Sequence, residues 1–195
     1  MRNQHTKILV EGAAMVALAT ILSMIQVFKL PWGGTVTLLS MLPIALFSIK
    51  YGVRKGLSVS FVFSIIQFVL GATFDGLFGW GLTVKALIAC ILLDYISAYT
   101  LLGFSGMFRN KGMAGWITGT VIAVFFRFIC HFISGVFIFH SFGELWSGFS
   151  TENIYLYSLL YNGCYMLPEM IFTGIGAFVL FKVPQTKKLL ITAEA

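Results

Sequence analysis

An arginine and a histidine lie inside an apolar stretch, residues 125–135, whose length and flanks are typical of a membrane segment. Arg127, His131 and Gly135 follow one another at intervals of four residues, so on a helix they share one face. Ionisable side chains are costly in hydrocarbon, and where they occur they usually mark a functional site. This face is therefore a candidate functional surface.

A carboxylate, Asp94, lies in the middle of another apolar run and is followed by Tyr95. In a low dielectric such a carboxylate needs a cationic partner. The partner could be Lys85, Arg127 or His131, which would make a purely structural pair, or it could be a cationic ligand.

Tyr157 and Asn162 bring further polar groups to the start of the apolar run 154–181. Together with His131 they could hydrogen-bond the edge of a heteroaromatic ring. Aromatic side chains nearby suit a flat cationic ring, through stacking and cation–π attraction. The set as a whole favours a binding site over isolated structural pairs.

The composition places these residues in a polytopic membrane protein. Of 195 residues, 58% are hydrophobic and only 10% are charged, against about 25% charged in a soluble domain. The length allows roughly six spans of about 20 residues, with no room for a soluble catalytic or ATPase domain. No GxxxxGK[ST] phosphate loop occurs, so energy for any transport must come from another subunit. The three cysteines lie in apolar runs without CxxC spacing and are expected to be buried, so no metal or cofactor is expected.

The chain is expected to form one all-α membrane domain, residues 1–195, with six transmembrane helices. The predicted helices span residues 8–27, 36–49, 57–70, 82–102, 113–139 and 154–181. Pro43 is expected to kink the second. Lysine and arginine collect at both termini and in alternate loops, a positive-inside pattern that places both termini in the cytoplasm. This pattern explains the net charge of +6 without a nucleic-acid partner.

With this topology, the polar residues fall at similar depths, at about 1.5 Å per helical residue. Asp94 and His131 lie near mid-membrane, and Tyr157 and Asn162 lie in the outer half. The loop aromatics face the same side; they are Trp32, Phe78, Trp80 and Phe139. Such a gathering predicts a pocket that opens outward.

Three stretches resemble one family, the thiamine-specific substrate-binding subunit (S component) of energy-coupling factor vitamin transporters. The stretches are Leu92-Leu93-Asp94-Tyr95-Ile96-Ser97-Ala98, Arg127-Phe128-Ile129-Cys130-His131-Phe132-Ile133-Ser134-Gly135-Val136 and Tyr157-Ser158-Leu159-Leu160-Tyr161-Asn162-Gly163. The resemblance covers nearly the whole chain.

The resemblance implies a role for each matching position. Asp94 would lie beside the thiazolium ring, with Tyr95 following it as in the family. Ligand contacts are also implied for His131, the Gly135 backbone, Tyr157 and Asn162, and Trp32 would cover the ligand. Phe139 stands where a stacking tryptophan is expected. Arg127 could pair with Asp94 in the empty state or bind the phosphate of a phosphorylated ligand.

The implied function is capture of thiamine by a non-enzymatic subunit of the bacterial plasma membrane. Import would need a transmembrane coupling subunit and two cytoplasmic ATPases. Ala13 and Ala17 resemble the AxxxA surface on which the coupling subunit docks.

Other functions remain open. An S component for another vitamin is one, although riboflavin and biotin have no permanent cation and need no buried carboxylate. A rhomboid-like protease is another, because Gly103-Phe104-Ser105-Gly106 matches GxSG. Ser105 and His131 are, however, expected to lie roughly 15–20 Å apart in depth, and a nucleophilic serine needs its base within hydrogen-bond reach. An ion channel is disfavoured by the short loops.

Overall fold

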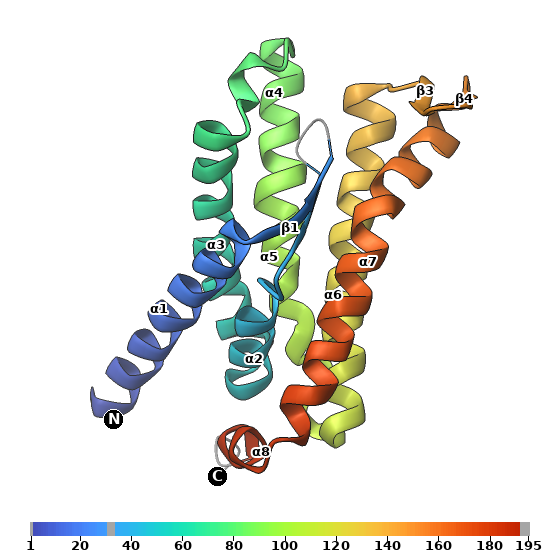
Figure 1. Ribbon diagram of the computed structural model, residues 1–195. Coiled ribbons are helices and arrows are strands. Elements are labelled where there is room, and N and C mark those ends of the chain that lie inside the picture. The colour runs from blue at the N-terminus through green and yellow to red at the C-terminus, as the bar shows by residue number, and fades with distance from the viewer. Residues whose placement is uncertain (1, 31–33, 192–195) are drawn as a thin grey trace.

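The computed structural model describes residues 2–30 and 34–191, and its elements are mainly helical (Figure 1). The α-helices are α1 (Arg2–Met24), α2 (Leu42–Tyr51), α3 (Val53–Phe74), α4 (Val84–Cys90), α5 (Ala98–Thr100), α6 (Gly112–Ser134), α7 (Ile154–Lys182) and α8 (Pro184–Ile191). Further helical segments are the 3-10 turns η2 (Leu77–Gly79) and η4 (Leu101–Lys111) and the π-helical turns η3 (Ile91–Ser97) and η5 (Gly135–Phe139). The strands are β1 (Gln26–Lys29), β2 (Thr35–Thr37), β3 (Gly143–Trp146) and β4 (Phe149–Thr151).

The protein is an all-α membrane protein. In the described part of the chain, four helical segments are long and apolar enough to cross a bilayer; they are Asn3–Met24, Val53–Phe74, Val84–Phe139 and Ile154–Lys182. On α7, Ile171, Ile175 and Val179 recur every four residues and are 56–59% exposed. An apolar stripe of this kind suits contact with lipid.

The segment Val84–Phe139 is 56 residues long but consists of two antiparallel limbs. Phe108 leaves helical geometry (φ −113°, ψ 25°), and Gly112 adopts a φ of 62°, a left-handed conformation that glycine tolerates best. In Figure 1 the α4–α5 limb descends to this reversal, and α6 returns beside it. The basic turn predicted between the helices at 82–102 and 113–139 is therefore present, in 3-10 form.

The first two predicted helices are interrupted in the structure by a pair of strands that was not predicted, and the third is longer than predicted, at Val53–Phe74 rather than 57–70. The first ends at Met24 rather than residue 27, and the second begins at Leu42 rather than residue 36, because β1 and β2 pair as an antiparallel hairpin between them. The predicted kink at Pro43 is wrong, since this proline occupies the first turn of α2, where a missing N–H costs nothing. At ten residues, α2 is too short to cross a bilayer alone.

The helices approach most closely where glycine replaces side chains. The Gly106 N–H donates to the Ser48 hydroxyl at 3.0 Å, and a Cβ at Gly106 would overlap the backbone oxygen of Ser48. Gly103 abuts the backbone of Leu57 in the same way. The GxSG sequence is thus a packing motif between η4, α2 and α3.

The geometry also excludes the protease interpretation of this sequence. The Ser105 hydroxyl donates to the Leu102 carbonyl at 2.7 Å and is buried. A Cβ at Gly119 of α6 would overlap the Ser105 backbone oxygen, so the two residues are neighbours. His131 lies about 18 Å further along α6, at about 1.5 Å per residue. Ser105 and His131 therefore cannot form a catalytic pair.

Gly106→Ala is expected to lower the thermal-unfolding midpoint of the detergent-solubilised protein by roughly 4 °C or more. The added methyl group overpacks a backbone contact, which costs about 1–3 kcal/mol. Circular dichroism on heating measures the shift. Gly79→Ala is the matched control, because a Cβ there meets nothing within 4 Å. Equal midpoints for the two variants would contradict this role.

Candidate ligand-binding site

A cavity of about 530 Å³ lies between the β1–β2 hairpin, α3, the α4–α5 limb, α6 and α7. Its volume falls in the range of small-molecule sites. Eight of the predicted site residues line it, and these are Asp94, Tyr95, Arg127, His131, Gly135, Phe139, Tyr157 and Asn162. Trp32 lies outside the described residues. The fold therefore brings together side chains from three separate sequence stretches.

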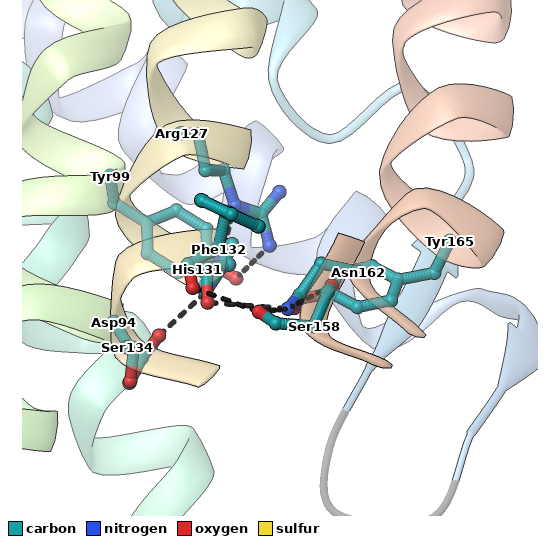
Figure 2. A network of polar contacts seen from close by, with 9 residues as sticks. All are labelled: Asp94, Tyr99, Arg127, His131, Phe132, Ser134, Ser158, Asn162 and Tyr165. Carbon is teal, nitrogen blue, oxygen red and sulfur yellow. Dashed lines mark hydrogen bonds and ion pairs between the residues drawn. The ribbon is translucent and has the colours of Figure 1, made fainter. Parts of the chain in front are cut away.

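Asp94 is held by two residues of α6. The His131 Nδ1 lies 2.8 Å from one carboxylate oxygen, and the Ser134 hydroxyl donates to the other (Figure 2). The side chains of Asp94 and His131 are only 13% and 11% exposed. Of the three residues predicted as partners of Asp94 within the protein, His131 is the one that contacts it. Lys85 and Arg127 both lie in the described part of the chain, and neither forms an ion pair with Asp94.

Arg127 determines the proton arrangement of His131. Its Nε donates to the Nε2 of His131 at 3.3 Å, so Nε2 is an acceptor and the ring proton lies on Nδ1, from which it is donated to Asp94. The same guanidinium donates to the Tyr99 hydroxyl at 2.8 Å and contacts the Met41 sulfur at 3.4 Å. The result is a directed chain from Arg127 through a neutral histidine to the carboxylate.

Asn162 fastens α7 to α6 at the cavity wall. Its amide nitrogen donates to the Ser158 carbonyl at 2.9 Å and to the His131 carbonyl at 3.2 Å, and its oxygen accepts from Tyr165 at 2.8 Å. A Cβ at Gly135 would overlap the Ser158 hydroxyl. Gly135 thus permits the close approach of α7 and also lines the cavity.

Two π-helical turns shape the cavity. Asp94 and Tyr95 lie in η3, and Gly135 and Phe139 lie in η5. A π turn adds a residue to the helical repeat and rotates the side chains that follow, and such turns are frequent at functional sites. The Tyr95 ring packs against Gly71, where a Cβ would overlap the hydroxyl, and meets Phe68 edge-on at 6.0 Å.

Aromatic rings and an ion pair line other parts of the cavity. Trp80 and Phe139 lie 6.0 Å apart between ring centroids, and Tyr157 stacks on Tyr161 at 6.3 Å. The Lys29 ammonium of β1 pairs with Asp75 at 2.6 Å, which ties the hairpin to the end of α3.

Sequence reasoning missed Ser134, Tyr99, Ser158 and Tyr165. Ser134 and Tyr165 follow His131 and Asn162 by three positions, and Ser158 precedes Asn162 by four. These helical spacings could have identified them. Tyr99 follows Tyr95 by four positions, so the same spacing could have identified it as well.

The remaining candidates take up different positions. Ala13 and Ala17 are exposed on one side of α1, whereas Val16 and Ala19 face the core. Among the described residues no group of three or more His, Cys, Asp or Glu side chains could hold a metal ion. Cys90 and Cys130 are buried as expected, but Cys164 is exposed, because it lies on the outer face of α7.

Comparisons with known proteins agree with this arrangement. A family model described as thiamine transporter protein matches residues 9–189. A thiamine transporter of Bacillus subtilis is 32% identical over 187 residues, covering 89% of each chain, and one of Lacticaseibacillus paracasei is 25% identical over 73% of this chain and 71% of its own length. A solved structure of the corresponding Listeria monocytogenes protein, 21% identical, superposes with a TM-score of 0.71 over 96% of this chain and 98% of its own, and so shares the fold. The chain belongs to the thiamine transporter family.

Proposed function

We propose that this protein is the thiamine-binding subunit of an energy-coupling factor importer. The observation that carries the proposal is the buried Asp94 carboxylate beside an aromatic-lined cavity. Its hydrogen-bond partners His131 and Ser134 are neutral, so its negative charge is not cancelled where it faces the cavity. A cationic ring is the ligand that such a site favours.

In this proposal the two rings of thiamine occupy different parts of the cavity. The thiazolium would lie near Asp94 and Tyr95, and the aminopyrimidine would lie between the rings of Phe139 and Tyr157. Asn162 and His131 supply the polar wall, and Trp32 would cover the ligand after entry from outside.

The topology we propose has six spans, both termini in the cytoplasm, and one membrane domain over residues 1–195. α1 begins and α8 ends at the same end of the bundle (Figure 1), as this topology requires. The arrangement of basic residues supports a cavity that opens on the outer side of the bacterial plasma membrane. Because α2 is too short to cross the bilayer alone, this topology requires β2 and α2 to cross it together.

Transport itself would need partners. The exposed small residues Ala13 and Ala17 allow a second helix to approach α1 closely. We propose that a transmembrane coupling subunit docks there and that two cytoplasmic ATPases drive release of thiamine inward.

Asp94→Asn is expected to weaken thiamine binding by about 100-fold, because an isosteric amide keeps the shape but removes the charge. Quenching of intrinsic tryptophan fluorescence during titration of the purified protein measures the affinity. Glu144→Gln, which removes an exposed carboxylate on β3, serves as the control and should bind normally. If thiamine did not quench the fluorescence of the native protein but another vitamin did so strongly, the proposed function would be refuted.

Phe139→Leu is expected to weaken thiamine binding by about tenfold, because leucine retains apolar bulk but cannot stack on a ring. Phe139→Trp should bind at least as tightly as the native protein. The same titration provides the measurement. Equal affinities for the leucine and native proteins would show that Phe139 does not contact the ligand.

Ala17→Trp is expected to abolish thiamine uptake by cells while leaving binding to the purified protein unchanged. A bulky side chain on the exposed face of α1 blocks close helix approach without disturbing the cavity. Uptake of radiolabelled thiamine and titration in detergent separate the two effects. Ile175→Trp, on the exposed face of α7, is the control and should transport normally. Normal uptake by Ala17→Trp would rule out docking at this surface.

A further inference from the structure

Glu169, a second buried carboxylate, lies behind the cavity wall on α7 and is 1% exposed. The Thr37 backbone N–H donates to one of its oxygens at 2.7 Å, and the Thr37 hydroxyl donates to the other at 2.6 Å. The Ser40 hydroxyl lies 2.6 Å from that of Thr37. With both oxygens accepting, the hydroxyl groups run in one direction, from Ser40 through Thr37 to Glu169, an arrangement that favours the ionised carboxylate.

Arg127 has no such direct counter-charge. It is 4% exposed, and its contacts are the neutral groups of Tyr99, Met41 and His131. Within residues 2–30 and 34–191 no carboxylate forms an ion pair with it. A buried guanidinium without compensation would be very costly.

The turn between β2 and α2 connects the two charges. Thr37 and Ser40 hydrogen-bond toward Glu169, and the next residue, Met41, contacts the guanidinium of Arg127 through its sulfur. Arg127 is also close enough for an electrostatic attraction to Glu169. The carboxylate and the guanidinium thus contact residues of the same short turn.

The charges that would surround a bound cation explain why Arg127 needs a counter-charge. Lys29 and Asp75 neutralise each other at the hairpin. Two cations would then remain, Arg127 and the ligand. Among the described residues that line the cavity, Asp94 is the one carboxylate that is not already paired with a cation. Without a second negative charge, Arg127 would repel the ligand and compete with it for Asp94.

We propose that Glu169 is the counter-charge of Arg127, a positioning residue that leaves the charge of Asp94 for the ligand and so gives the site its preference for a cationic ring. This inference rests on the proposed function. Glu169 does not touch the cavity, so it acts through Arg127 and the turn at Thr37.

The test compares affinities for thiamine and for a neutral isostere in which a thiophene replaces the thiazolium. The measured quantity is the preference, the ratio of the two affinities, in the purified full-length protein. Glu169→Gln should lower this preference about tenfold or more, because one negative charge is lost in a medium of low dielectric. Arg127→Gln should raise it, and the double variant should return it close to the native value, since the two charges are coupled.

Thr37→Val separates charge from anchoring. It removes the hydroxyl that binds Glu169 but keeps the carboxylate, so it should change both affinities by the same factor. An unchanged preference in Glu169→Gln, including an equal loss of affinity for both ligands, would show that Glu169 is only a structural anchor and would overturn the proposal. If Glu169→Gln does not fold, an unchanged preference in Arg127→Gln overturns it equally. Absence of thiamine binding by the native protein would instead refute the proposed function.

Discussion

The hydrogen bond between His131 and Asp94 sets the electrostatics of the whole cavity. A buried carboxylate is tolerated only where hydrogen bonds replace the water it has lost. His131 and Ser134 supply these bonds from one face of α6, and Arg127 fixes the histidine as the neutral tautomer. Because both direct partners are neutral, Asp94 keeps its negative charge, and a cation can complete the site.

Close packing of the helices holds this network in place. Gly135 lets α7 approach α6 until Ser158 and Asn162 bond the α6 backbone. At the other end of the bundle Gly103 and Gly106 bring η4 against α2 and α3. At Gly103 and Gly106 backbone meets backbone, and at Gly135 short side chains of α7 reach the α6 backbone. Such close contacts leave little freedom, so the polar groups between them are preorganised rather than assembled on binding.

Much of the site was accessible from sequence because helical periodicity and loop charge are local signals. The four-residue spacing of Arg127 and His131 defined one face, and the positive-inside pattern brought Asp94 to the same depth. The hydrogen bond between Asp94 and His131 was one of several open possibilities, and only packing could select it. The π turns at Asp94 and Gly135 have no sequence signature and were not predicted.

Other errors came from reading short patterns without their tertiary partners. Val36 and Thr37 were assigned to the start of a helix, but these β-branched residues pair with β1. Pro43 looked like a kink because the start of its helix was misplaced. Glu169 was visible as an intramembrane acid, yet its partner Thr37 lies 132 residues away, and no local pattern connects them.

A structure of the protein with thiamine bound tests the central claim most directly. The account predicts that the thiazolium ring lies within about 6 Å of the Asp94 carboxylate, a range in which opposite charges interact strongly. His131 should still donate to that carboxylate, and aromatic rings should flank the ligand. A thiamine molecule bound elsewhere in the cavity, with its cationic ring away from Asp94, would contradict the account.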